Sequence, residues 1–208
     1  IIVTSSVAAV RNTNHDETHH YSEKDFNVTA TLKTESYPFS KIQAEMKAHE
    51  LIKNQKGNVE LAIINPSFVL GPPIGNSLNK STSLSTVAGY LGGTWKVLPL
   101  QFGCVDIQNV VDAHIAASKV KLAKDSKDNR FIISHEVPLP HLEMCKILKK
   151  HFPKYNVPLT MNKKMNRVYL LDNTKAKTVL GIKFIPIETT LKNMGESLIK
   201  KGLVEKIE

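Results

Sequence analysis

Short apolar runs that alternate with longer amphipathic segments most restrict how this chain can fold. The runs 1–4, 59–64 and 131–134 are rich in β-branched residues, as is typical of buried parallel strands. Segment 36–54, between the first two runs, repeats its apolar residues every 3.6 positions and is predicted to be helical. Strands that alternate with helices of this length predict a doubly wound parallel α/β fold.

The rest of the chain fits the same pattern. Residues 11–35 are polar and irregular, which predicts a long surface loop. Only about three strands are predicted, fewer than a self-standing parallel sheet usually has. Further helices are expected at 84–91, 107–122, 139–152, 174–180 and 187–201, with glycines after the last two as C-caps.

Composition excludes several classes of partner. A chain of 208 residues predicts one domain, or one domain and a small lobe. The net charge of +9 comes from thinly spread lysines, whereas specific nucleic-acid sites favour arginine and interleaved aromatic residues. We therefore expect a solvated basic surface that helps to attract a phosphate-bearing ligand, and no nucleic-acid partner. No apolar run approaches the ~18 residues of a membrane helix.

Cysteine and histidine spacing argues against a metal site. Cys104 and Cys145 are far apart and predict free thiols in a reducing compartment, which favours the cytoplasm or the interior of an organelle. His15, His19 and His20 have a helical metal spacing but no acidic or cysteine partner arranged around them. We expect solvated histidines there and no metal.

Tyr37 and Lys41 form a candidate proton-donating pair. A free phenol ionises near pH 10 and is a weak acid at neutral pH. A lysine four positions on shares its helix face, and at ~4 Å its charge would stabilise the phenolate by roughly 4 kcal/mol. Ser6, or alternatively Ser5, ends a strand where its hydroxyl could bond a substrate oxygen. The alternative reading of the pair is a core-facing ring and a solvated cation.

Four stretches, in this order and spacing, resemble the extended short-chain dehydrogenase/reductases, and among them the dihydroflavonol-reductase-like branch of the NAD-dependent epimerase/dehydratase superfamily. They are Val3-Thr-Ser-Ser6, Tyr37-Pro-Phe-Ser-Lys41, Asn65-Pro-Ser-Phe-Val-Leu-Gly-Pro72 and Val105-Asp-Ile-Gln-Asn-Val-Val-Asp-Ala-His114.

The resemblance implies a fold and a set of roles. Tyr37 resembles the general acid of the family, Lys41 the lysine that activates it and holds the nicotinamide ribose, and Ser6 the carbonyl-orienting serine. Pro66 and Val69 match positions that touch the nicotinamide of NADP or NAD. The implied reaction is reduction of a ketone or aldehyde, a small-molecule substrate, by NADPH or NADH.

The same resemblance implies a division of the chain within a Rossmann-type fold. Residues 1–70 would be the C-terminal half of the dinucleotide-binding domain, and 71–106 an insertion in the substrate lobe. Residues 107–135 would return a helix and a strand to the sheet, and 136–208 would complete a small α/β substrate lobe.

One element of the family pattern is missing from this sequence. The glycine-rich turn that holds the dinucleotide pyrophosphate should precede Ile1. We therefore expect the chain to be a fragment whose strand 1–4 is an open sheet edge. Alternatively, a second copy or a partner chain covers that edge, or cofactor binding has been lost. Two functions stay open beside reduction: a non-catalytic structural subunit and a sugar-nucleotide epimerase or dehydratase.

Other polar and aromatic residues are assigned structural roles. His114 is predicted to be a satisfied core histidine. Asp106 is expected to cap the helix that follows it, and Asp112 to lie on the polar side of that helix. Trp95 and Phe102 fit a pocket lining and ordinary packing equally well.

Overall fold

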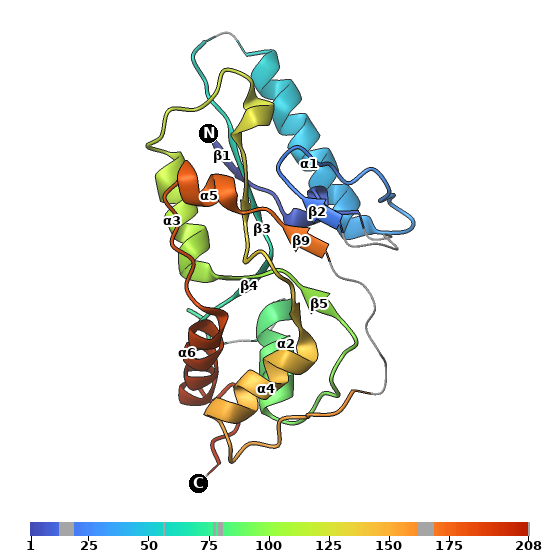
Figure 1. Cartoon of the computed structure of the whole chain (residues 1–208), viewed down its shortest axis with the longest axis vertical. Coiled ribbons are helices and arrows are strands. Elements are labelled where there is room, and N and C mark those ends of the chain that lie inside the picture. The colour runs from blue at the N-terminus through green and yellow to red at the C-terminus, as the bar shows by residue number, and fades with distance from the viewer. Residues whose placement is uncertain (13–18, 56, 77, 79–80, 162–168, 208) are drawn as a thin grey trace. The chain divides into compact units, whose positions relative to one another are not determined.

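The structure, a computed structural model, describes residues 1–12, 19–55, 57–76, 78, 81–161 and 169–207 (Figure 1). Contacts divide the chain into two compact units, each built from three stretches of sequence. Unit 1 comprises Ile1–Ser67, Gln108–Val137 and Arg167–Phe184. Unit 2 comprises Phe68–Ile107, Pro138–Asn166 and Ile185–Glu208.

A three-stranded parallel sheet is the centre of unit 1. Its order is β1 (Ile2–Thr4), β3 (Ala62–Pro66) and β7 (Arg130–Ile133). Every residue of β3 is buried, as expected of the central strand of a covered parallel sheet. Among the described strands β1 pairs only with β3.

Helices α1 (Ser36–Lys53) and α3 (Ile107–Ala117) lie on either side of β1 in Figure 1. A short helix, α5 (Thr174–Thr178), also belongs to this unit, and so do two 3-10 turns, η1 (Val7–Ala9) and η2 (Ser126–Asn129). The predicted α/β class with parallel strands is therefore confirmed.

The helix predicted at 36–54 is confirmed as α1, but its buried stripe was not predicted. The buried residues lie roughly a quarter turn from the periodic apolar residues of this segment: Ile42, Glu45 and His49. Two of these three are polar, so a search for apolar periodicity passes over them. The helix expected at 107–122 ends at Ala117.

The expected loop at 11–35 contains a strand. Residues His19–Tyr21 form β2, which pairs in parallel with β9 (Tyr169–Leu171). Tyr21 and Leu171 are buried in a small core with Val10, Ile132 and Tyr169. Three residues are too few to show a period of two, so periodicity could not predict this pair of strands.

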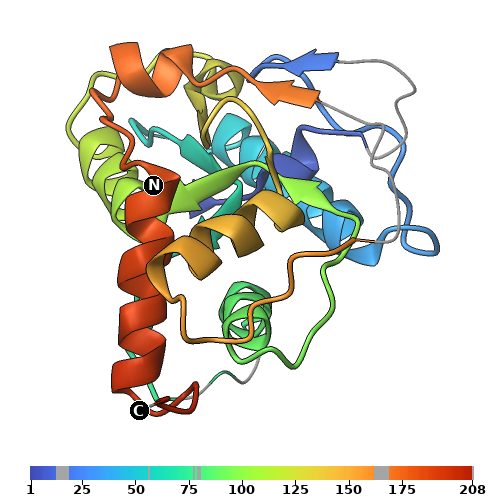
Figure 2. The ribbon, with the colours of Figure 1, turned by 60° about the horizontal axis from the view of Figure 1, so that its bottom comes forward.

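Unit 2 is built around three helices, α2 (Thr82–Leu91), α4 (His141–His151) and α6 (Ile187–Lys200), seen in Figure 2 in green, gold and red. Strand β4 (Phe68–Leu70) pairs in parallel with β6 (Cys104–Asp106). Strand β5 (Gln101–Phe102) pairs antiparallel with β8 (Leu139–Pro140). The helix predicted at 139–152 therefore starts two residues late, because Leu139 and Pro140 are used in a strand.

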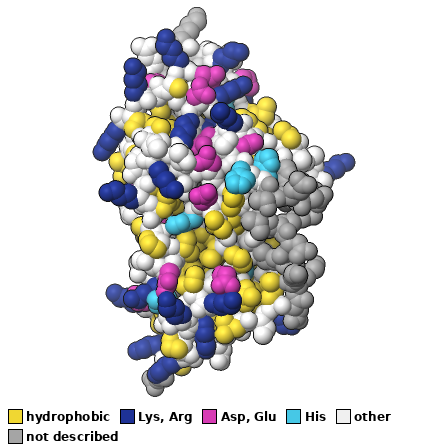
Figure 3. All heavy atoms as spheres, in the orientation of Figure 1, with side chains coloured by type: hydrophobic (Ala, Val, Ile, Leu, Met, Phe, Trp, Pro, Cys, Tyr) yellow, Lys and Arg dark blue, Asp and Glu magenta, His cyan; other side chains and the backbone are white. Residues whose placement is uncertain are grey.

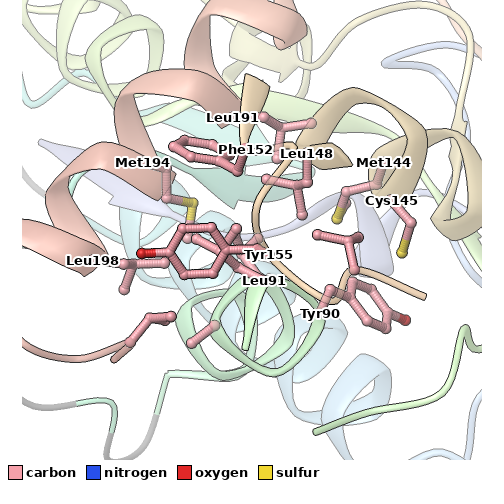
Figure 4. Close-up of a cluster of buried hydrophobic side chains, with 14 of the residues drawn as sticks. Tyr90, Leu91, Met144, Cys145, Leu148, Phe152, Tyr155, Leu191, Met194 and Leu198 are labelled. Carbon is pink, nitrogen blue, oxygen red and sulfur yellow. The ribbon is translucent and has the colours of Figure 1, made fainter. Parts of the chain in front are cut away.

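The helices of unit 2 share one apolar core (Figure 4). Leu191, Met194 and Leu198 of α6 are fully buried, as their spacing predicted. The figure shows them together with Phe152, which directly follows α4, and with side chains from α2 and α4, among which Tyr90, Met144, Cys145 and Leu148 are labelled. Gly195 is required in this packing, because a Cβ there would lie 2.5 Å from the Phe152 ring.

Charge is dispersed over the face of the molecule that Figure 3 shows. On the face shown in Figure 3, lysine and arginine side chains are scattered, with acidic side chains between them. This face has no continuous basic patch, consistent with the predicted solvated surface. Among the described residues no helix is long and apolar enough to cross a membrane.

His141 makes unit 2 acid-sensitive. It is buried, its Nδ1 lies 2.7 Å from the Tyr90 hydroxyl, and burial lowers its pKa to about 4. An unfolded histidine has a pKa of about 6.5, so between these values the unfolded state binds a proton that the folded state does not. The contribution to stability is complete above pH 6.5 and is lost as the pH falls towards 4.

We expect the titration of His141 to lower the free energy of unfolding by about 3 kcal/mol when the pH falls from 7 to 4. Urea unfolding at both pH values measures the loss. His141→Gln should flatten the pH dependence, whereas His20→Gln, at an exposed position, should not. Equal pH dependence in His141→Gln and the unaltered chain would contradict the assignment.

Candidate functional site

Helix α1 begins where the candidate pair lies. Pro38 falls in the first turn, where its missing N–H costs no helical hydrogen bond. The Ser40 hydroxyl donates to the Tyr37 carbonyl at 2.8 Å. Thr31 and Thr34 form a compact turn before the helix, with their hydroxyls 2.8 Å apart. The local sequence thus sets Tyr37 and Lys41 in the first two turns of the helix.

Tyr37 and Lys41 lie on the same side of α1. The Lys41 Nζ is 5.8 Å from the centroid of the Tyr37 ring. The Tyr37 side chain is 57% exposed, so it is not the core-facing ring of the alternative reading. Among the described residues, neither the Tyr37 hydroxyl nor the Lys41 Nζ has a hydrogen-bond or ion-pair partner. Both groups are therefore available to a ligand.

The two serines after β1 have different partners. The Ser6 Oγ accepts the Ala8 N–H at 3.1 Å, as the N-cap of η1. Among the described residues it donates no hydrogen bond, so its hydroxyl hydrogen is free. Ser5 instead donates its hydroxyl hydrogen to the Glu45 Oε2 at 2.6 Å. This difference favours Ser6 over Ser5 as the group that bonds a substrate oxygen.

Pro66 lies beside the serines, and Val69 belongs to unit 2. Pro66 ends β3, which runs parallel to β1 with Thr4 opposite Ile64, so both strands end at the same edge of the sheet. Asn65 confirms the proximity, because its Nδ2 donates to the Ser6 carbonyl at 3.2 Å. Val69 lies in the middle of β4 and pairs with Val105.

Gly71 follows β4 and needs its lack of a side chain. It has a φ of +150°, and a Cβ would lie 2.5 Å from the Ile107 side chain. Its amide points at the Met194 Sδ, 3.3 Å away. The glycine in the Val69-Leu-Gly-Pro72 stretch is therefore explained by close packing within unit 2.

A buried polar network lies next to the candidate site, and the sequence analysis missed it. Glu45 and Arg130 are fully buried, with the Arg130 Nε donating to the Glu45 Oε1 at 2.5 Å. Asn65 donates to the other carboxylate oxygen at 3.1 Å. The only sign in the sequence is a glutamate four residues after Lys41, on the adjoining part of the helix surface.

The remaining polar candidates have structural partners. The His114 ring lies 2.8 Å from the Thr4 hydroxyl and 2.7 Å from the Val110 carbonyl, so it has partners as predicted. It is half-buried, however, and not the core residue that was expected. Asp106 accepts from the Thr190 hydroxyl at 2.7 Å, and Asp112 accepts from Gln108 at 2.8 Å.

The aromatic candidates have ring partners, and the thiol candidates are buried. The Trp95 ring meets the Tyr90 ring edge-on at 6.3 Å, and the Phe102 ring lies 5.2 Å from that of Phe68. Cys104 and Cys145 are free and buried, as predicted, and burial raises the pKa of each thiol to about 12.

The histidine cluster does not form a metal site in the part of the chain that the structure describes. His15 lies outside the described residues. The His19 ring packs against the Tyr21 ring in a tilted arrangement, with their centroids 4.3 Å apart, and His20 is exposed. Within the described ranges, no group of three or more histidine, cysteine or acidic residues could hold a metal ion.

Comparison with known proteins identifies reductases. The chain is 32% identical to cinnamoyl-CoA reductase 2 of Arabidopsis thaliana, over 97% of this chain and 60% of the relative. It is 28% identical to the NADPH-dependent methylglyoxal reductase GRE2 of Saccharomyces cerevisiae, over 96% of this chain and 63% of the relative. No model of a protein family matches.

A solved structure has the same fold. The yeast methylglyoxal/isovaleraldehyde reductase Gre2, crystallised with NADPH, superposes with a TM-score of 0.80 at 25% identity. The match covers 98% of this chain and 64% of the reductase. The chain thus spans about 60% of the length of the curated relatives it matches.

Glu23 lies near the network of Glu45 and Arg130. It is half-buried, and this position disfavours the ionised form of its carboxyl group. Its Oε1 accepts the Ile132 N–H at 3.0 Å, and burial raises its pKa above the ordinary value. A raised carboxyl pKa favours folding below the ordinary value of about 4.3, and this contribution is lost as the pH rises through the raised pKa.

Glu23→Gln should therefore stabilise the chain at pH 7.5, since the amide oxygen can still accept the Ile132 N–H without carrying a buried charge. We expect a rise in Tm of roughly 2–4 °C at pH 7.5 and a smaller one at pH 4. Thermal unfolding at both pH values tests this. Glu50→Gln, on the exposed side of α1, is the control, and an equal change in Tm at both pH values in Glu23→Gln would contradict the argument.

Proposed function

We propose, from the premise that this chain belongs to the extended short-chain dehydrogenase/reductase superfamily, that the protein carrying it reduces a ketone or aldehyde with NADPH or NADH. One observation carries the proposal. Tyr37 and Lys41 stand together in the first two turns of α1, and among the described residues their polar atoms have no other partner.

The residues present suit a nicotinamide cofactor and a carbonyl substrate. An exposed phenol and a free ammonium group can bond the ribose hydroxyls of a dinucleotide, and Pro66 ends the neighbouring strand at the same sheet edge as Ser6. We assign contact with the nicotinamide to Pro66 and Val69. The relatives named above include enzymes described as NADPH-dependent, which favours NADPH over NADH.

Each side chain has a distinct chemical task. When bound, the nicotinamide supplies the hydride. The Ser6 hydroxyl donates a hydrogen bond to the carbonyl oxygen and orients it. Tyr37 gives its hydroxyl proton to that oxygen as negative charge develops on it. Lys41 stabilises the phenolate that remains, because a nearby cation lowers the energy of an anion.

The first experiment asks whether the natural polypeptide that carries this sequence binds NADPH or NADH and reduces small aldehydes and ketones. Methylglyoxal, which carries a ketone and an aldehyde, is the suitable first probe, because one relative is named for it. A cinnamoyl thioester, after the name of another relative, tests a different class of carbonyl compound. Binding of neither cofactor, or turnover of UDP-glucose without net use of cofactor, would overturn the proposal.

Tyr37→Phe should lower kcat by about 10²- to 10⁴-fold, because it removes the proton donor while keeping the ring. Cofactor affinity should stay nearly intact, because Lys41 still bonds the ribose hydroxyls. Steady-state kinetics and cofactor titration measure the two effects. Tyr155→Phe removes a hydroxyl in unit 2 and is the matched control. Full activity in Tyr37→Phe would refute the assigned role.

Lys41→Ala should weaken both turnover and cofactor binding, since the ammonium group serves the phenolate and the ribose hydroxyls. Lys47→Ala removes an exposed lysine of the same helix that pairs with Glu50, and should change neither. The same assays apply. A loss of turnover with unchanged cofactor affinity would limit the lysine to the first of its two tasks.

A further inference from the structure

Glu45 contacts three different parts of unit 1 from within α1. Its carboxylate is fully buried. One oxygen accepts from the Arg130 Nε at 2.5 Å, and the other accepts from the Ser5 hydroxyl at 2.6 Å and from the Asn65 Nδ2 at 3.1 Å. A carboxylate has only acceptors, so each of these contacts needs a donor that is held in place.

The contacts of Glu45 fix the turn that carries Ser6. Ser5 is held by its hydroxyl to Glu45 and by its amide to the Ile64 carbonyl at 2.8 Å. Asn65 donates both to Glu45 and to the Ser6 carbonyl. The Ser6 hydroxyl oxygen is held in turn by the Ala8 amide. Hydrogen bonds therefore hold Ser5 to α1 and β3, and Ser6 to β3.

Arg130 fixes the carboxylate itself. Its Nη1 donates to the carbonyls of Glu23 at 2.5 Å and Asp25 at 2.6 Å, and its guanidinium lies 3.7 Å from the centroid of the Phe26 ring. The guanidinium is thus anchored on two sides. A buried carboxylate beside a fixed cation has one favourable orientation, because turning away would leave both charges unpaired.

We propose that Glu45, held by Arg130, is a positioning residue that sets the Ser6 hydroxyl relative to Tyr37 and Lys41. The inference rests on the proposed function, because it assigns the network to the placement of that catalytic hydroxyl. The structural basis is that Glu45 belongs to the helix that carries the proton donor and touches the turn that carries the serine. One rigid contact therefore joins the two halves of the candidate site.

The proposal predicts a particular pattern of kinetic losses. A misplacement of about 1 Å can cost 10²-fold in rate, so Glu45→Gln should lower kcat by about 10- to 100-fold with little change in cofactor affinity. If Glu45 acts through Ser6, its loss costs little once the hydroxyl is gone. The double variant Ser6→Ala/Glu45→Gln should then be no slower than Ser6→Ala alone.

Two further variants separate positioning from folding. Glu45→Gln leaves Arg130 buried without a counter-charge and could unfold the protein. Ser5→Ala keeps the ion pair, removes only the hydroxyl bond to Glu45, and should lower kcat by about fivefold. His49→Gln is the matched control, because His49 is a buried polar residue of the same helix face whose partner is Ser126, at 2.8 Å.

Amide hydrogen exchange gives a readout that does not depend on turnover. In the natural polypeptide, Ser5→Ala and Glu45→Gln should speed exchange at residues 5–10, and His49→Gln should not. Unchanged exchange in a folded Glu45→Gln or Ser5→Ala variant would overturn the inference. The inference would also be overturned if the loss of kcat in the double variant equalled the product of the losses in the two single variants. If the unaltered protein reduces no carbonyl compound, the proposed function fails, and the exchange data alone decide whether Glu45 fixes the turn.

Discussion

The buried ion pair between Glu45 and Arg130 determines how the parts of unit 1 fit together. Two fully buried charges are costly to remove from water, and each is tolerable only because the other is present and because the Arg130 Nη1 has its own acceptors. Loss of one partner of such a pair typically costs 3–5 kcal/mol. The pair therefore holds α1, the first residue of β7 and the turn after β1 in one arrangement.

The pair also explains how the polar segment that contains Glu23 and Asp25 can be ordered although it has little regular secondary structure. The backbone carbonyls of Glu23 and Asp25 find their donor in Arg130, and the Ile132 amide of β7 finds its acceptor in the Glu23 side chain. Buried backbone groups need partners, and here side chains supply them where a strand would not reach. The same segment leads into α1, so its order helps to define where the helix begins.

The sequence predicted those parts of the fold that rest on apolar periodicity or glycine caps. Helix α6 is an example, since Leu191, Met194 and Leu198 are all fully buried. It could not predict the pairing of β2 with β9, because three-residue strands far apart in sequence carry no pattern. The buried stripe of α1 was missed because Glu45 and His49 count as polar until their partners are known. Serine, tyrosine and lysine could be identified by spacing, whereas Arg130 lies 85 residues from Glu45.

The acceptor-only chemistry of Glu45 distinguishes two neighbouring serines that spacing alone leaves equivalent. A carboxylate oxygen accepts a hydrogen bond from any hydroxyl that reaches it, and here the Ser5 hydroxyl is the donor, at 2.6 Å. The other carboxylate oxygen is engaged by Arg130, and Ser6 points its oxygen at the Ala8 amide instead. The hydroxyl hydrogen of Ser6 thus has no acceptor among the described residues. The buried charge pair therefore gives two identical neighbouring side chains different hydrogen-bonding capacity, and this difference is why the proposed role falls to Ser6.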